Sequence, residues 1–187
     1  MRLVVTEFIT LDGDIEDPGG SEKTPNGGWA FRFDRGPEGD KFKLDELMEA
    51  DAQLFGRKTY EGFAAAWPSM KDDVGFADRM NSMPKYVVSN TLQEATWNNT
   101  TILRGDIVEA IRKLKQQPGR DILVAGSRQL VQTLAEHQLV DEYRLMVFPF
   151  IRGGSMRLFG EGLPATALKI VESRPMGSVL TVRLQPA

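Results

Sequence analysis

Two segments of this chain share one design, in which an apolar strand runs through a glycine turn into a helix. In the first segment, residues 52–55 are apolar, Gly56 follows, and a helix is expected to open near Thr59. In the second, residues 121–125 form a strand that is apolar after Asp121, and Gly126-Ser127 leads into a further helix. Strands buried on both faces read as unbroken apolar runs, and strands that alternate with helices build parallel sheets. This design predicts an α/β fold.

The remaining elements extend the same alternation without a linker or repeat. Residues 142–151 are apolar on both faces, which predicts a central strand or a subunit interface, with a bend or lost pairing at Pro149. Asp106 is expected to cap a helix that begins after it. The sequence therefore predicts one domain over residues 1–187, with a mixed, mostly parallel sheet and a C-terminal antiparallel hairpin. Strands are expected over residues 2–11, 51–55, 85–89, 101–103, 167–173 and 178–184, and a helix over about 41–50.

Composition excludes several classes of function. The net charge is −3 and the pI about 5.3, with basic residues scattered, so nothing predicts a nucleic-acid or anionic membrane partner. The absence of cysteine excludes disulfides, thiolate metal sites and a cysteine nucleophile. The lone His137 is expected to end a helix, so we predict no metal site. No apolar run reaches transmembrane length, and a cytoplasmic protein is expected.

The turn at residues 56–59 has the chemistry of an anion site. Glycine lets the backbone approach a ligand, and the first turn of a helix presents free N–H groups with a favourable dipole. Arg57 adds a planar, bidentate donor for phosphate, and Lys58 adds a second positive charge. In the second turn, Gly126 and Ser127 would likewise let the backbone approach an anion. The alternative is that Thr59 only caps a helix and that both glycines only turn the chain.

The motifs around these turns carry a family resemblance. Gly56-Arg57-Lys58-Thr59 resembles the cofactor-binding turn of dihydrofolate reductases, and residues 122–127 resemble their second glycine turn, although a Gly-Gly pair is usual there. Val87-Val88-Ser89-Asn90 is similar to their strand end near the adenosine 2′-phosphate. Residues 139–142, Gly153-Gly154 and 157–159 resemble the reductase domain of the riboflavin-pathway bifunctional deaminase-reductase. The resemblance implies a three-layer α/β/α dihydrofolate reductase-like fold.

The resemblance also implies hydride transfer from NADPH to a small pteridine- or aminopyrimidine-like heterocycle, or to a carbonyl, by a homodimer. Arg57, Lys58 and Thr59 would then bind one or both phosphate groups, and Ser89 with Asn90 would contact the 2′-phosphate or ribose. Gly126 and Ser127 would lie against the pyrophosphate. A second hypothesis is a non-catalytic nucleotide- or ligand-binding homodimer that keeps the fold. A third hypothesis is that a flavin occupies the cleft between cofactor and substrate sites.

The substrate side is predicted from residues 14–37, a long Gly- and Pro-rich excursion that we expect to form a cleft wall or lid. Trp29, Phe31 and Phe33 alternate there and are predicted to present a flat apolar surface to a planar ring. Asp40, at the expected start of a helix, is predicted to donate a proton with a raised pKa, or simply to cap the helix. Asp12 is a second candidate, and turn chemistry is its alternative explanation.

Overall fold

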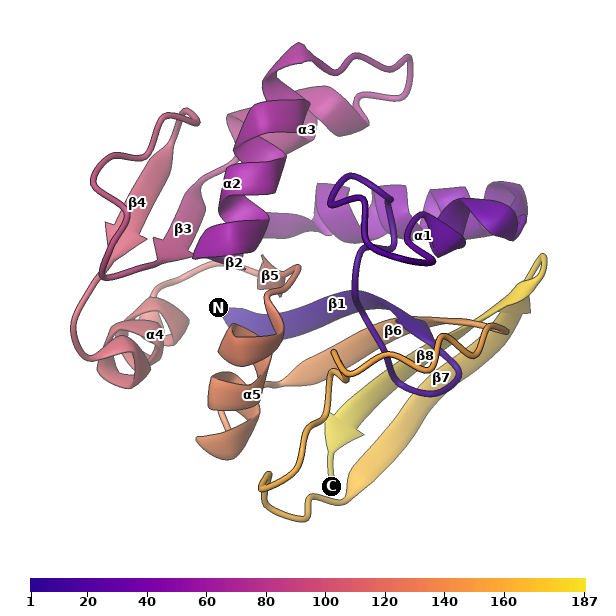
Figure 1. Cartoon of the computed structure of the whole chain (residues 1–187). Coiled ribbons are helices and arrows are strands. Elements are labelled where there is room, and N and C mark those ends of the chain that lie inside the picture. The colour runs from indigo at the N-terminus through magenta and orange to yellow at the C-terminus, as the bar shows by residue number, and fades with distance from the viewer.

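A computed structural model describes residues 1–187 and contains one eight-stranded sheet in the order β4-β3-β2-β5-β1-β6-β8-β7 (Figure 1). All pairings from β4 to β6 are parallel, while β8 pairs antiparallel with both β6 and β7. The predicted fold class is therefore confirmed. The strands are β1 (Arg2–Thr10), β2 (Ala50–Gly56), β3 (Lys85–Val88), β4 (Thr100–Leu103), β5 (Asp121–Val124), β6 (Glu142–Phe148), β7 (Leu168–Met176) and β8 (Val179–Pro186).

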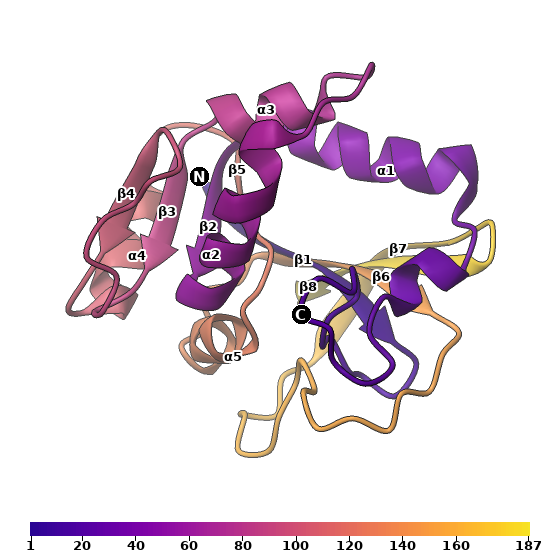
Figure 2. The same cartoon turned by 45° about the horizontal axis from the view of Figure 1, so that its top comes forward.

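Helices cover both faces of this sheet, which gives three layers (Figures 1 and 2). On one face Val4 and Phe55 of the sheet pack with Leu47, Tyr60 and Met80 of α1, α2 and α3. On the other face a larger core unites sheet residues with the apolar sides of α4 and α5. The helices are α1 (Gly36–Glu49), α2 (Arg57–Ala66), α3 (Phe76–Ser82), α4 (Ile107–Gln116) and α5 (Arg128–Glu136), with short 3-10 helices η1 (Trp29–Arg32) and η2 (Trp67–Ser69).

The position of β5 sets where a ligand can enter. The chain builds β1, β2, β3 and β4 outward, then returns to insert β5 between β2 and β1 before crossing β1 to reach β6. Open α/β sheets bind ligands at the carboxyl ends of their strands, where the strand order reverses. Here that place is the end of β5, beside the ends of β1 and β2. Both glycine turns named above lie there.

Two local expectations need correction. The helix predicted to start near residue 41 begins at Gly36, because Pro37 fits the first helical turn, where its missing N–H costs nothing. Residues 29–32 form the 3-10 helix η1 rather than a strand. The bend at Pro149 is confirmed, since β6 ends at Phe148, and β6 is buried between β1 and β8. None of the helices combines the length and apolar character needed to span a membrane.

Candidate nucleotide-binding site

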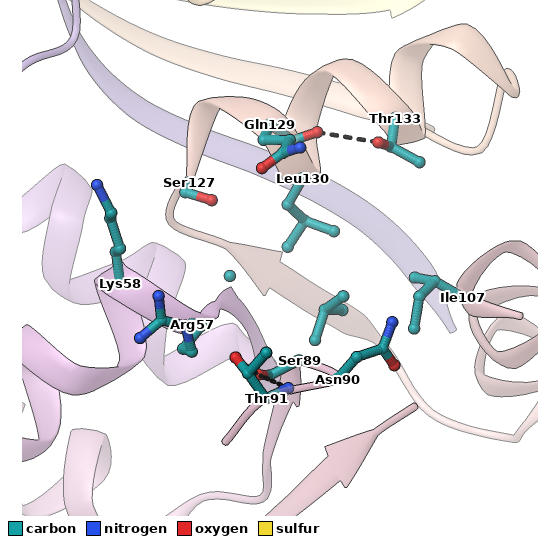
Figure 3. Close-up of a pocket in the computed structure, with 12 residues that line it drawn as sticks. Arg57, Lys58, Ser89, Asn90, Thr91, Ile107, Ser127, Gln129, Leu130 and Thr133 are labelled. Atoms are coloured by element: carbon teal, nitrogen blue, oxygen red, sulfur yellow. Dashed lines mark hydrogen bonds between the residues drawn. The ribbon is translucent and has the colours of Figure 1, made fainter. Parts of the chain in front are cut away.

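A cavity of about 400 Å³ opens between the start of α2, the start of α5 and the loop after β3 (Figure 3). Only 3 of its 12 lining residues are hydrophobic, so it suits phosphates and sugars better than an apolar ring. Six of the predicted cofactor residues line it: Gly56, Arg57, Lys58, Ser89, Asn90 and Ser127. The sequence did not single out the others, which are Val88, Thr91, Ile107, Gln129, Leu130 and Thr133.

The two glycine turns meet at the base of this cavity. The amide of Gly56 donates to the carbonyl of Gly126 at 3.3 Å, and the Gly126–Ser127 peptide bond is cis. A Cβ added to Gly56 would lie only 2.2 Å from Ser127 Oγ. Gly56 is therefore required for close approach of the two turns, which explains why glycine stands at the end of β2.

Both helices that face the cavity begin without a side-chain cap. Gly56 precedes α2 and Ser127 precedes α5, and neither makes a side-chain capping hydrogen bond. By contrast, Asp106 caps α4 as predicted, accepting the Glu109 amide at 3.0 Å. The first N–H groups of an α-helix need partners and favour negative charge. Two uncapped helix starts at one polar cavity therefore form an anion-binding arrangement.

The basic residues at the cavity are exposed enough to bind an anion. Arg57 pairs with Glu61 one turn along α2 at 2.9 Å, and both side chains are almost half exposed. An exposed pair of this kind contributes little to stability, so Arg57 can exchange Glu61 for a phosphate at small cost. Lys58 is exposed beside it, and both side chains line the same cavity (Figure 3).

Ser89 and Asn90 shape the loop after β3. Ser89 Oγ accepts hydrogen bonds from the amides of Leu92 at 2.9 Å and Thr91 at 3.2 Å. Asn90 Oδ1 accepts from the Gly105 amide at 3.1 Å. These oxygens are engaged in holding the loop, so the direct contact predicted for them with the 2′-phosphate or ribose depends on their remaining atoms.

Thr59 and Gly126 lie just behind the cavity wall. Thr59 does not open α2, which begins two residues earlier at Arg57. A Cβ on Gly126 would lie 2.9 Å from Thr59 Oγ1, and Gly126 has a φ of 69°, which strains any other residue. The two residues therefore support the turn from inside rather than lining the cavity.

The two predicted proton donors are not placed for that role. Asp40 lies within α1 rather than at its start, pairs with Arg35 at 2.6 Å, and has a side chain that is 67% exposed, so it neither caps the helix nor is desolvated. Burial tends to raise the pKa of Asp12, but hydrogen bonds from Thr10, Gly153 and Arg152 outweigh it and leave the pKa below its ordinary value. These hydrogen bonds within the turn explain why an aspartate stands at position 12.

The three aromatic residues do not form one surface. Trp29 is fully buried, donates from Nε1 to the Glu16 carbonyl at 2.9 Å, and packs 5.1 Å from the Phe148 ring. Phe31 is 80% exposed, while Phe33 packs against Phe148. Alternate residues share a face only in a strand, and η1 is helical, so the predicted flat surface does not exist.

Glu7 is the residue at this end of the sheet that the sequence prediction missed. It lies on β1 beside the Gly126 turn, where a Cβ on Gly126 would be 3.6 Å from Glu7 Oε1. This oxygen is buried and has no hydrogen-bond partner. Burial raises the pKa of Glu7 to about 8, although the Gly126 backbone and Lys43 act in the opposite direction. The sequence feature that could have revealed Glu7 is that it is the one charged residue in residues 3–11.

The same arrangement of sheet and turns defines a known protein family. The RibD C-terminal domain matches residues 2–182. The chain belongs to the RibD C-terminal domain family. The uncharacterized protein YyaP of Bacillus subtilis (strain 168) is 30% identical over 180 residues, which is 95% of this chain and 90% of YyaP.

Solved structures share this family fold at lower identity. A Shewanella sp. PV-4 protein named for riboflavin biosynthesis has 20% identity and a TM-score of 0.79, with 100% of this chain and 99% of that chain covered. A diaminohydroxyphosphoribosylaminopyrimidine deaminase/5-amino-6-(5-phosphoribosylamino)uracil reductase of Thermotoga maritima has 18% identity and a TM-score of 0.65. That match covers 100% of this chain and 56% of the Thermotoga chain. These two matches establish the fold alone.

Proposed function

We propose that this RibD C-terminal domain protein is an NADPH-dependent reductase. Its substrate would be a small pteridine- or aminopyrimidine-like heterocycle or a carbonyl compound. The single observation that carries the proposal is the polar cavity onto which two uncapped helices and the Arg57-Lys58 pair converge. A phosphorylated dinucleotide has the anionic groups that this arrangement accommodates. The family and the pyrimidine-reducing enzyme of the same fold support the choice of substrate class.

The chain's own residues have distinct tasks in binding such a cofactor. The helix-start amides after Gly56 and Ser127 would hold the pyrophosphate, because those N–H groups face the cavity without side-chain caps. Arg57 and Lys58 would bind the 2′-phosphate, and Ser89 and Asn90 would shape the wall beside the ribose. When bound, NADPH supplies a hydride equivalent, and the protein contributes orientation, exclusion of water and a proton.

Titration calorimetry with NADPH and NADH tests the cofactor. We expect tighter binding of NADPH, because only NADPH carries the 2′-phosphate that the basic pair can bind. Equal affinity for both nucleotides would remove the 2′-phosphate assignment, and no binding of either would overturn the reductase. Oxidation of NADPH, followed by absorbance with a panel of pteridines, aminopyrimidines and small carbonyl compounds, then tests turnover.

Replacing Arg57 by alanine should weaken NADPH binding by about 1.5–3 kcal/mol and leave NADH binding nearly unchanged. Glu61→Gln should give equal or tighter NADPH binding, because Glu61 competes with the phosphate for Arg57. Lys113→Ala is a matched control, since Lys113 forms a similar exposed pair with Glu109 on α4. The same calorimetric titration measures all three variants, and an equal loss of NADH affinity in Arg57→Ala would contradict the assignment.

A non-catalytic ligand-binding protein is the second candidate. The observation in its favour is that neither Asp40 nor Asp12 is placed as a proton donor. The two proposals separate on turnover. Nucleotide binding without oxidation of NADPH by any compound in the panel would favour the binding protein, whereas oxidation with any of them would eliminate it.

A further inference from the structure

Glu7 lies on β1 just beyond the last residue pair of the β1–β5 ladder. The parallel ladder between β1 and β5 ends at the pair Val5–Val124, after which the chain of β5 leaves for the Gly126 turn. On its other side β1 continues to pair with β6, where Glu7 lies opposite Leu145. Glu7 therefore lies on a rigid central strand, at the point where its neighbour has moved away and the strand order reverses.

The surroundings of Glu7 compensate its charge only weakly: the Gly126 backbone forms a hydrogen bond with the carboxyl group, but Oε1 has no partner. Of the elements packed against it, α1 contributes Lys43 and Glu46, and α2 contributes only the hydroxyl of Thr59 next to Gly126. Lys43 Nζ is already bound to Glu46 Oε2 and, at 2.6 Å, to Thr6 Oγ1. Glu46 Oε2 also accepts from Thr6 Oγ1 at 2.9 Å. The one nearby cation is thus neutralised by Glu46.

A purely structural role does not explain this carboxyl group. Buried polar groups in proteins are almost always hydrogen-bonded, and an unpartnered buried oxygen is unfavourable by about 1–3 kcal/mol. Glu7 Oε1 is such an oxygen, in the middle of the central strand. The residue as a whole is only partly buried, although this oxygen itself is shielded from solvent. Carboxyl groups kept neutral in this way are typical of general acids.

The position of Glu7 also connects it to the nucleotide site. It borders the turn whose next residue, Ser127, lines the nucleotide cavity, so the carboxyl group and the cavity lie on the two sides of one peptide turn. We propose that Glu7 is the proton donor of the reductase, acting on a C=N or C=O group of the substrate. This inference rests on the function proposed above and adds the acid that the reaction requires.

The chemical balance of the step is simple. A bound NADPH would supply the hydride equivalent for the new C–H bond of the substrate. As it is transferred, the O–H bond of Glu7 breaks, and an N–H or O–H bond forms on the adjacent substrate atom. The Glu7 carboxylate then regains a proton from water. Glu7 is suited to this because burial holds its pKa near 8, so at neutral pH the carboxyl group still carries its proton.

The first experiment compares wild-type protein with Glu7→Gln, which keeps the shape of the side chain but cannot donate an acidic proton. We expect kcat to fall by about 10²–10⁴-fold, while the Kd for NADPH measured by calorimetry changes less than about twofold. In the wild type kcat should decrease as pH rises through about 8. Residual activity of Glu7→Gln should lack this dependence, and Glu7→Asp should restore part of it. Glu109→Gln, an exposed carboxylate on α4, is the control.

The second experiment detects the proton without turnover. Infrared difference spectra between the wild type and Glu7→Gln, collected across pH, should show one protonated carboxyl group that ionises near pH 8. Ionisation in the usual range for glutamate would overturn the proposal.

The kinetic outcomes separate this proposal from the function on which it rests. Unchanged turnover and pH profile in Glu7→Gln would overturn only the role of Glu7, and a loss of turnover in Asp40→Asn instead would assign the proton to Asp40. Failure of the wild type to oxidise NADPH with any substrate would overturn both.

Discussion

At the scale of single residues, the neighbours of each carboxylate decide its chemistry. Asp12 accepts two backbone amides and the Thr10 hydroxyl, and its pKa falls although burial opposes this. Glu142 is fully buried as well, but hydrogen bonds from Arg144 and Gln185 outweigh desolvation and lower its pKa to about 2. For Glu7 desolvation is larger than the opposing effects of the Gly126 backbone and Lys43, and it raises the pKa. The same functional group thus serves as a turn residue, an ion-pair partner or an acid.

The raised pKa of Glu7 predicts a specific dependence of stability on pH. Its value rises from 4.5 in the unfolded chain to about 8 in the fold. Between these values the unfolded chain ionises while the folded protein retains the proton, so the free energy of unfolding falls as pH rises and levels off above about 8. Glu7→Gln removes this term. Urea denaturation should show the variant gaining stability relative to the wild type across this window, by a few kcal/mol in total. A difference that stays constant with pH would contradict the prediction.

At the scale of elements, the site depends on how two strand–turn–helix units are joined. The end of β2 and the end of β5 lie side by side because these strands pair, with Leu54 opposite Val124. Gly56 then permits its turn to touch Ser127. The helix starts reach the same cavity only because both turns are tight. The unit of function is therefore a pair of elements rather than either motif alone.

Gly56→Ala tests this pairing. The added Cβ would lie 2.2 Å from Ser127 Oγ, so we expect the turns to separate, with lower thermal stability and weaker NADPH binding. The double variant Gly56→Ala with Ser127→Ala should recover part of both, since the closest contact is removed. Gly62→Ala is a control within the same helix, because nothing lies within 4 Å of its added Cβ; it should stabilise the protein by about 0.5–1 kcal/mol. Calorimetry and thermal denaturation measure both effects, and equal behaviour of the two single variants would contradict the pairing.

At the scale of the whole molecule, the sheet ends in an antiparallel pair with exposed apolar side chains. The sequence allowed residues 142–151 to be either a central strand or a subunit interface. β6 is a central strand, and this position explains its apolar character. Three of the exposed apolar residues lie on β7 and β8, where Ile170 is 64% exposed, Val171 44% and Leu180 42%. β7 is also an edge strand, which presents unpaired backbone groups.

We therefore expect a homodimer that buries this edge. Ile170→Asp combined with Leu180→Asp should shift the protein to a monomer of 20.9 kDa in light scattering, because a charge in an apolar interface is unfavourable. Ile151→Asp is the control, since Ile151 is 70% exposed but lies outside the two strands. A wild-type monomer at micromolar concentration would refute the dimer, and dissociation by the control variant alone would place the interface elsewhere.

Much of the fold and part of the site follow from local sequence. Continuous apolar runs, such as residues 122–124, are sufficient to mark buried parallel strands, because burial on both faces favours apolar side chains. Asp106 marks a helix start, and Gly56 with Arg57 and Lys58 marks the cavity, because capping and turn chemistry act over three or four residues. These features are properties of neighbouring residues, so the sequence by itself determined them.

Two features depend on tertiary structure: the protonation of Glu7 and the arrangement of the excursion over residues 14–37. Trp29 is buried because the long excursion folds onto Phe148, over a hundred residues away in the chain. The pKa of Glu7 is raised because residues of α1 and the Gly126 turn close around the carboxyl group and leave its Oε1 without a partner. Desolvation and charge pairing act through space, and no local pattern records which distant groups will arrive. The sequence alone therefore determined the turns and basic residues that border the polar cavity, and only the assembled sheet determined which carboxyl group is desolvated beside them.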